Sequence, residues 1–293
     1  MSADVVRGRA RGKRATIRRL SRHWWFHLAT SAVLLVALYP VLWMVLTSFK
    51  PTNEIIQSTN LLPRTWTFDN FSTGWVAYGA ETFGTYFANS ALVATLCVIG
   101  NLITCTLTAY AFSRLSFPGR TVLFAVVIGI LFLPKEVLLI PQYSLFHLLG
   151  WTDSVVPLVL PHFLALDAFF VFLSVQFLRG LPRELDEAAV LDGCGPIRRF
   201  WHVTLPLVRP ALATTAIFTF IWAWNDYMPQ LMYLNSPDNY TLPIGLRMFL
   251  DATAGSDLGA MSAMSLLSLL PLFAMFVIFQ RQLIEGVTMT GFK

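Results

Sequence analysis

Residues 184–206 read ELDEAAVLDGCGPIRRFWHVTLP, a polar stretch set between two long apolar segments of the chain. Asp186 and Glu187 lie in the first turns of a predicted helix, where the helix dipole favours negative charge. Gly193 can supply the left-handed residue that ends this helix, and Pro196 suits the first position of another. The stretch therefore predicts a short, charged helical hairpin that interrupts an otherwise hydrophobic chain.

The second helix of this hairpin is predicted to be amphipathic. The spacing i, i+3, i+4, i+7 of a single helix face is met by Ile197, Phe200, Trp201 and Thr204. Pro206 is expected to end the helix ahead of the next apolar segment. In the first helix, Ala188 and Ala189 stand where a core helix would carry larger side chains, so the surface of another protein could approach the backbone there.

The composition of the chain identifies a membrane protein. Of its 293 residues, 56% are hydrophobic and only 13% are charged, which lies outside the range of soluble globular domains. A membrane-spanning helix needs about 20 apolar residues. Six segments meet this length: residues 24–46, 86–112, 122–140, 155–178, 211–234 and 258–279. We expect an all-α protein with six transmembrane helices, whose even number places both termini on one side.

The distribution of Lys and Arg predicts which side that is. Seventeen of the 21 lie before the first span, between spans two and three, between spans four and five, or after the last span. Cytoplasmic loops carry such a positive excess, so both termini and the hairpin are predicted to be cytoplasmic. Residues 1–23 are then a basic cytoplasmic arm, and residues 24–293 form the transmembrane domain with the hairpin loop at 179–209. Topology and anionic headgroups account for the net charge of +5, so no nucleic acid is expected as a partner.

Three functions are compatible with the hairpin on these grounds. An amphipathic hairpin can lie on lipid headgroups. Its carboxylates at Asp186, Glu187 and Asp192 could instead hold Mg²⁺ against a diphosphate, as in a membrane-embedded transferase. Alternatively, the hairpin can dock into a groove on a cytosolic protein. The physical chemistry of the stretch does not choose among the three.

The order of residues in the hairpin resembles the "EAA" loop in permease subunits of binding-protein-dependent ABC importers. The matching residues are Glu187-Ala188-Ala189, Asp192-Gly193 and Leu205-Pro206. Other stretches that resemble the sugar-importer branch of this family, nearest the maltose and glycerol-phosphate type, are Thr47-Ser48-Phe49-Lys50, Asn89-Ser90, Ala109-Tyr110-Ala111 with Arg114, Phe117-Pro118-Gly119, Ile140-Pro141-Gln142-Tyr143, Leu149-Gly150, Trp224-Asn225-Asp226 and Glu285-Gly286-Val287-Thr288. The resemblance extends along nearly the whole chain.

The resemblance implies a type I importer permease fold, in which the hairpin is the coupling helix between spans four and five. This helix would sit in a cleft of a cytosolic ATPase subunit, with Glu187 as a charged anchor to a basic group. The small Ala188 and Ala189 would allow close approach, Asp192 and Gly193 would form the turn, and Leu205-Pro206 would transmit movement into span five. Closure of two ATPase subunits would then rock two permease subunits between inward-open and outward-open states.

The implied partners are a second permease subunit, expected to be a different chain, two cytosolic ATP-binding subunits and an extracytoplasmic solute-binding protein. The chain has no Walker-type glycine loop, so it is not expected to be an enzyme, and ATP and Mg²⁺ are assigned to the partner ATPase. We expect no cofactor in this chain. The implied location is the bacterial plasma (inner) membrane, as a multi-pass protein in contact with lipid. A sugar, an oligosaccharide or a glycerol-phosphate-like polyol are all compatible as the solute.

Polar residues within the predicted spans are candidates for the solute pathway. Asp167 lies near the middle of span four, where a charge costs about 2.5–3.5 kcal/mol on insertion scales. It could instead be a buried carboxylate satisfied by a hydroxyl, or reach the outer water through a helix break near Pro157 and Pro161. In span five, aromatic faces are combined with an amide and a carboxylate, as in sugar sites, at Trp222, Trp224, Asn225, Asp226 and Tyr227.

Other interpretations of these polar and aromatic residues remain open. Aromatic residues also gather at membrane interfaces, which is an equal alternative for the span-five cluster. Lys135 and Glu136, at the end of span three, are expected to be interface anchors. The five histidines have no metal-ligand spacing, so no metal site is predicted.

Overall fold

The computed structural model describes residues 24–57, 60–76, 81–250 and 257–290, with side chains except for 281–290. The basic arm predicted at residues 1–23 lies outside this range. The described residues contain helices and no strands, in the order α2 (Trp24–Ser48), α3 (Thr52–Gln57), α4 (Asp69–Val76), α5 (Phe83–Arg114), α6 (Arg120–Ile130), α7 (Lys135–Leu148), α8 (Val156–Phe163), α9 (Ala168–Gly180), α10 (Glu184–Leu191), α11 (Pro196–Arg199), the π-helix η1 (Phe200–Thr204), α12 (Leu205–Leu207), α13 (Arg209–Asn225), α14 (Met228–Tyr233), the 3₁₀ helix η2 (Pro237–Asn239), α15 (Leu242–Met248) and α16 (Leu258–Thr290).

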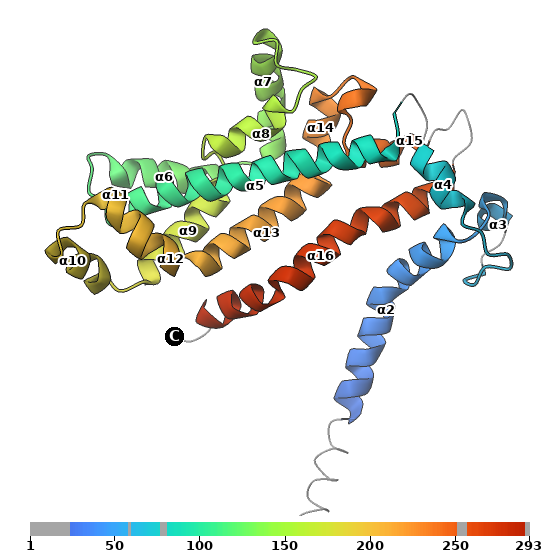
Figure 1. Cartoon of the computed structure of the whole chain (residues 1–293), viewed down its shortest axis with the longest axis horizontal. Coiled ribbons are helices and arrows are strands. Elements are labelled where there is room, and N and C mark those ends of the chain that lie inside the picture. Colours follow the sequence, from blue (N-terminus) through green and yellow to red (C-terminus); the bar gives the residue numbers. More distant parts are fainter. Residues whose placement is uncertain (1–23, 58–59, 77–80, 251–256, 291–293) are drawn as a thin grey trace, which may run out of the picture.

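The 32-residue helix α5 is the centre of the bundle. It packs against α8, α9 and α13, and α13 packs in turn against α16 (Figure 1). Gly100 lets the end of α8 come close, because a Cβ atom there would lie only 2.8 Å from Cδ2 of Phe163. Buried apolar residues of α5, α9 and the hairpin form one core cluster, and those of α5, α13, α15 and α16 form another.

The membrane-spanning helices agree with the expected number but not with six continuous helices. Among the described residues, four helices are long and apolar enough to cross a membrane, and two bent helix pairs raise the number to six if each pair crosses once. Span three, expected at 122–140, is broken between α6 and α7 with a bend of 103°. Pro134 precedes α7 and disfavours helical geometry in the residue before it, which explains the break.

Spans four and five are also interrupted. In span four, α8 ends at Phe163 and α9 begins at Ala168, and Ala165 between them has the left-handed φ of 55° that non-glycine residues rarely adopt. In span five, α13 ends at Asn225 and α14 begins at Met228, with two residues between them. The span predicted at 155–178 is confirmed as one membrane-spanning segment with an internal break, and the one predicted at 211–234 is divided between α13 and α14.

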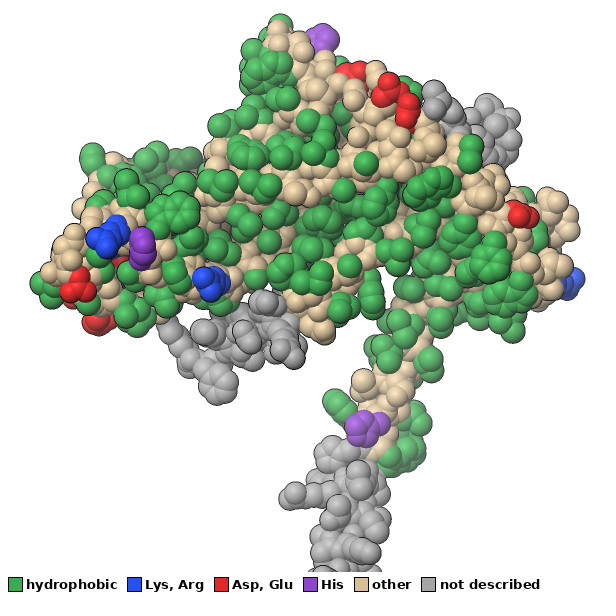
Figure 2. Space-filling view, viewed as in Figure 1, with side chains coloured by type: hydrophobic (Ala, Val, Ile, Leu, Met, Phe, Trp, Pro, Cys, Tyr) green, Lys and Arg blue, Asp and Glu red, His purple; other side chains and the backbone are tan. Residues whose placement is uncertain are grey.

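The exposed surface of the bundle is mostly apolar. Figure 2 shows hydrophobic side chains across the middle of the molecule, with basic and acidic side chains at its two ends, one of them formed by α10 and α11, and further acidic side chains along the upper edge. The last turns of α16 lie toward the end formed by α10 and α11 (Figure 1). Helix α2 contacts α16 and otherwise exposes most of its side chains. A surface of this kind is expected for a helix bundle that faces lipid or other membrane helices.

Candidate functional site

The polar hairpin is formed as the sequence predicts, and its turn depends on Gly193. This glycine has φ +77°. Its N–H donates to the carbonyl of Val190 at 2.9 Å, and the N–H of Cys194 donates to the carbonyl of Ala189, also at 2.9 Å. These two bonds make the Schellman arrangement that ends many helices, so the last carbonyls of α10 are satisfied. The chain can then reverse and begin α11 at Pro196.

The predicted coupling residues do not all face the same way. Glu187, Ala188 and Asp192 are exposed on α10 and its turn. Ala189 is only 7% exposed and packs inside the chain, so its small size serves the hairpin itself and contact with a partner would fall to Ala188. On α12, Leu205 is half-buried and Pro206 is exposed.

The amphipathic face expected for the second helix is wrong in part. Phe200 and Thr204 are buried as predicted, whereas Ile197 and Trp201 are exposed to 75% and 58%. Trp201 lies in the π-helical segment at 200–204, where a wider turn replaces the ordinary 3.6-residue period, whereas Ile197 lies before that segment. Buried residues consequently recur every fourth residue, at Phe200, Thr204 and then Val208.

Two residues near the end of α5 hold the hairpin. Nε of Arg114 lies 3.0 Å from Oδ2 of Asp186 on α10, and its Nη2 donates to the carbonyl of Leu181 at 3.1 Å. The hydroxyl of Tyr110 donates to the carbonyl of Pro196 at 3.0 Å, at the start of α11. Arg114 and Tyr110 belong to the motifs that resemble the family, but the sequence assigned them no role. Only the fold brings them to the hairpin.

The same ion pair bears on the magnesium alternative. Asp186 is turned toward Arg114, with its side chain 14% exposed, while Asp192 is exposed at the turn. Within the described ranges, no group of three or more His, Cys, Asp or Glu side chains is arranged to hold a metal ion. The geometry of Asp186, Glu187 and Asp192 therefore gives no support to a diphosphate site.

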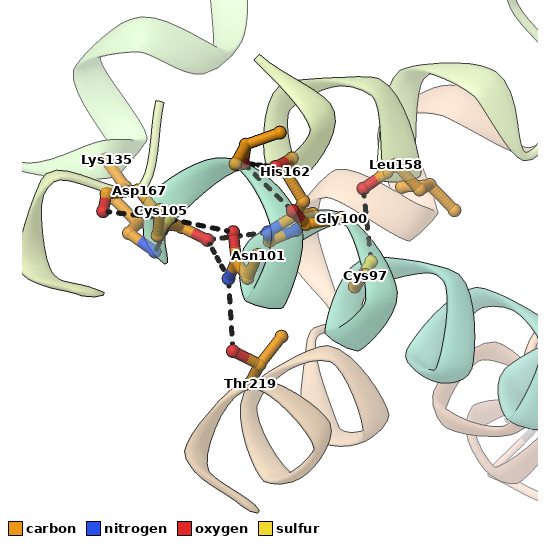
Figure 3. Close-up of polar contacts among 10 residues, drawn as sticks. Cys97, Gly100, Asn101, Cys105, Lys135, Leu158, His162, Asp167 and Thr219 are labelled. Atoms are coloured by element: carbon orange, nitrogen blue, oxygen red, sulfur yellow. Dashed lines mark hydrogen bonds and ion pairs between the residues drawn. The ribbon is translucent and has the colours of Figure 1, made fainter. Parts of the chain in front are cut away.

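A second polar site lies where the bundle is broken, and Figure 3 shows its contacts. We call Asp167, Lys135, His162 and Asn101 the Asp167 cluster. The Asp167 carboxylate accepts a hydrogen bond from Nδ2 of Asn101 at 2.6 Å, lies 2.6 Å from Nδ1 of His162, and forms an ion pair with Nζ of Lys135 at 3.3 Å. Nδ2 of Asn101 also donates to Oγ1 of Thr219 on α13 at 3.1 Å. Asp167 is thus a buried carboxylate, satisfied by an amide, an imidazole and an ammonium group instead of a hydroxyl.

The three helix breaks bring these charges together. Lys135 begins α7 after the first break, and Asp167 precedes α9 after the second without capping it through its side chain. Asp226 follows α13 at the third break and interacts electrostatically with both. Lys135, expected to be an interface anchor, instead has its ammonium group in this cluster. Opposite charges in neighbouring apolar spans were the signal that could have paired it with Asp167.

The aromatic cluster predicted in span five is divided by the fold. Trp222 is 42% exposed, contacts Phe169 and has the ammonium group of Lys135 5.4 Å from its ring centroid. Trp224 is only 2% exposed, and its Nε1 donates to the carbonyl of Ser268 at 3.2 Å, so it is a core residue of α13 and α16. The geometry gives Trp224 no place in a solute pathway.

The other polar residues of this cluster also separate. Asn225 and Asp226 are exposed, and the amide of Asn225 donates to the carbonyl of Ile221 in its own helix at 2.7 Å. Tyr227 is half-buried and accepts a hydrogen bond from Nη1 of Arg247 on α15 at 2.7 Å. Of the residues predicted for a solute pathway, Trp222, Asp226 and Asp167 share one region with Lys135.

Broken apolar spans, charges at the breaks and a polar hairpin at one end together define a membrane transport subunit. The family model described as "Binding-protein-dependent transport system inner membrane component" matches residues 103–288, and this chain belongs to that family. It is a multi-pass membrane protein, and the resemblance read from its sequence is confirmed.

Curated relatives cover most of the chain. It is 34% identical to the arabinooligosaccharides transport system permease protein of Halalkalibacterium halodurans, over 92% of this chain and 96% of that protein. It is 34% identical to a diacetylchitobiose uptake system permease protein of Streptomyces coelicolor, over 90% and 95% respectively. It is 30% identical to the trehalose transport system permease protein of Mycobacterium tuberculosis, over 88% and 93%.

Solved structures share the fold. A chain in the crystal structure of a bacterial ABC transporter involved in alginate import superposes with a TM-score of 0.77 at 22% identity, covering 89% of this chain and 97% of that chain. The expectation of an all-helical importer permease fold is therefore confirmed.

Proposed function

We propose that this chain is the transmembrane permease subunit of an ATP-driven ABC importer that moves a sugar or a related polyol across the plasma membrane by alternating access. The family membership supports the transport role. The relatives named for arabinooligosaccharides, diacetylchitobiose and trehalose support a carbohydrate as the solute. The alternative of a membrane-embedded transferase is set aside, because the chain belongs to a transport family and its hairpin carboxylates do not gather around a metal site.

The observation that carries this proposal is the hairpin at the end of the bundle. Its outer face presents Glu187, Ala188 and Asp192, while Ala189 and Phe200 anchor its inner face. A short helix held in this way has a rigid, partly charged surface that fits a groove on another protein. We assign that groove to one of two cytosolic ATP-binding subunits, the other being left to the second permease subunit, and the two would supply ATP and Mg²⁺ for the cycle.

The remaining partners follow from the same assignment. A second permease subunit, taken to be a different chain, would complete a two-fold pathway, and an extracytoplasmic solute-binding protein would deliver the solute. The hairpin and the end of α16 lie at one end of the molecule (Figure 1), in agreement with a cytoplasmic placement for both. Excess Lys and Arg in the same loops support that orientation. Reporter fusions at the two termini would test it.

The exposed region beside the Asp167 cluster is the proposed route of the solute. Trp222 offers an aromatic face, and Lys135 and Asp226 offer charged groups that can hydrogen-bond to hydroxyls. Irregular backbone at membrane depth is tolerated where it lines a cavity or is buried in protein. Helix breaks with polar side chains are accordingly common in transporter binding sites.

The variant Glu187→Ala tests the proposed function. It is made in the complete transporter, reconstituted in proteoliposomes with its partner subunits and solute-binding protein. We expect an assembled complex with weakened solute uptake and with ATP hydrolysis that is lost or no longer stimulated by the loaded binding protein. Uptake and ATPase stimulation that both survive unchanged would show that the docking assignment is wrong.

Glu184→Ala is the matched control, because Glu184 is also exposed on α10 but lies about one turn earlier. We expect near-normal uptake and ATP hydrolysis in this variant. Equal losses in both variants would point to a general effect of acidic charge on the hairpin and against Glu187 as the anchor.

A further inference from the structure

Both helices of the hairpin are attached to a single helix of the bundle. Arg114, the last residue of α5, reaches Asp186 on α10 and the backbone of Leu181 at the end of α9. One turn earlier on the same face of α5, Tyr110 bonds to the backbone of Pro196 on α11. The hairpin therefore cannot shift without either moving the end of α5 or breaking these contacts.

The attachment is largely shielded from water. The side chains of Arg114 and Asp186 are 6% and 14% exposed, and the ring of Tyr110 packs edge-on against Phe200 with centroids 5.3 Å apart. An ion pair at low exposure is screened by salt much less than a surface pair, so the attraction between Arg114 and Asp186 persists at physiological ionic strength. Its two residues also lie on different helices, α5 and α10, so a displacement of α10 can be passed to α5 through the pair.

The other end of this connection is the Asp167 cluster. From Arg114, α5 runs without a break or a proline to Asn101, about 20 Å away at the helical rise of 1.5 Å per residue. The amide of Asn101 donates both to Asp167 before α9 and to Thr219 on α13. A rigid displacement of α5 would therefore shift Asn101 relative to Asp167 and Thr219, and so change the contacts between the charged residues at the helix breaks.

The alternative route through Leu205 and Pro206 is less direct. These residues lie in α12, and the helices before Val208 meet α13 at an angle of 75°. A bent junction can absorb a displacement by changing its angle, whereas a continuous helix transmits it along its axis. We therefore expect movement of the hairpin to be coupled more stiffly to α5 than to α13.

We propose that α5 transmits movement of the hairpin to the Asp167 cluster as a rigid helix, and that Arg114 is the positioning residue that binds the hairpin to α5. The inference rests on the proposed function, since it describes how ATP-driven movement reaches the membrane. Arg114 touches neither ATP nor solute, and it acts by keeping α10 fixed relative to α5.

The test is the number of solute molecules moved per ATP hydrolysed by the reconstituted complete transporter. In Arg114→Ala we expect assembly and continued ATP hydrolysis, with the ratio lowered at least about fivefold, the lower end of typical coupling effects. Arg114→Lys keeps the charge and should recover part of the ratio. An unchanged ratio in Arg114→Ala would overturn the proposal, as would equal losses of uptake and hydrolysis, which indicate only a weakened structure.

Arg120→Ala is the matched control. Arg120 is the first residue of α6, just after the loop that follows Arg114. Its guanidinium donates to the carbonyl of Leu115 in that loop at 2.9 Å, so the ratio should stay at the wild-type value. If Arg114→Ala does not assemble, Tyr110→Phe decides, because it removes only the hydroxyl that bonds to Pro196 and keeps the ring. We expect a lowered ratio in Tyr110→Phe, and a wild-type ratio there would overturn the proposal.

The two proposals fail in different ways. A wild-type complex that takes up no solute with ATP would refute the proposed function, and the inference with it. A wild-type complex that is coupled, combined with normal coupling in Arg114→Ala, would refute the inference alone.

Discussion

Asp167→Ala should destabilise the protein far more than Lys135→Ala, although the two residues form one ion pair. Asp167 has a side chain only 10% exposed, whereas the Lys135 side chain is 74% exposed. Removing the carboxylate leaves His162 and one N–H of the Asn101 amide without an acceptor, and each such group costs about 1–3 kcal/mol, or about 2–6 kcal/mol in all. Removing the exposed lysine costs about 0–1 kcal/mol, because water screens it and Asp167 keeps its other partners.

These free energies translate into separate melting temperatures. At about 2–4 °C per kcal/mol for a chain near this size, Asp167→Ala should lower Tm by roughly 4–24 °C and Lys135→Ala by at most about 4 °C. The measurement is the thermal unfolding of the purified transporter in detergent, at one scan rate for all variants because unfolding of membrane complexes is often irreversible. Asp167→Asn keeps an acceptor of the same shape and should fall between the two.

The double variant supplies the sharpest comparison. If Asp167 is held mainly by Asn101 and His162, adding Lys135→Ala to Asp167→Ala should change Tm little further. Equal destabilisation by the two single variants, or a neutral Asp167→Ala, would refute the reasoning that burial decides the cost.

Two further predictions concern the loop between α7 and α8 and the central helix α5. Hydrogen bonds, first from the Ser236 hydroxyl and then from backbone N–H groups, lower the pKa of Asp153 below its ordinary value of 3.8. Its carboxylate therefore stabilises the folded loop above that pH, and the advantage of wild type over Asp153→Asn in thermal unfolding should be full at pH 6 and shrink as the pH falls below 3.8. Gly100→Ala should destabilise by about 1–3 kcal/mol through collision with Phe163, whereas Gly129→Ala, in helix α6 with open space around it, should be neutral or stabilising by up to about 1 kcal/mol. Equal Tm values for the two glycine variants would contradict the close contact at Gly100.

Much of the architecture could be predicted from the sequence because its causes are local. Apolar length sets the number of spans, and the hairpin follows from acidic residues in the first turns of α10 and a glycine that accepts a positive φ at position 193. The family resemblance depends on short motifs in fixed order, which need no coordinates. Pro134 also carried a local signal for the break in span three, although the apolar pattern around it suggested one continuous helix.

The sites depended on contacts between distant residues, which the sequence leaves open. Which side of α10 faces inward is decided by packing, so Ala188 is exposed and Ala189 is buried although both are small. A single π-helical segment turned Trp201 outward against the expected period. Trp224 and Trp222 are two residues apart, yet only the fold places one in the core and the other beside Lys135.

The sequence by itself determined a six-span helical membrane protein with a charged hairpin, because apolar length, turn chemistry and charge distribution act over short stretches of chain. Only the tertiary structure decided that Lys135 pairs with Asp167 and that Arg114 holds the hairpin to α5. The two residues of each pair are 32 and 72 positions apart in the chain. A charge is tolerated in the interior only when the fold brings a partner within reach.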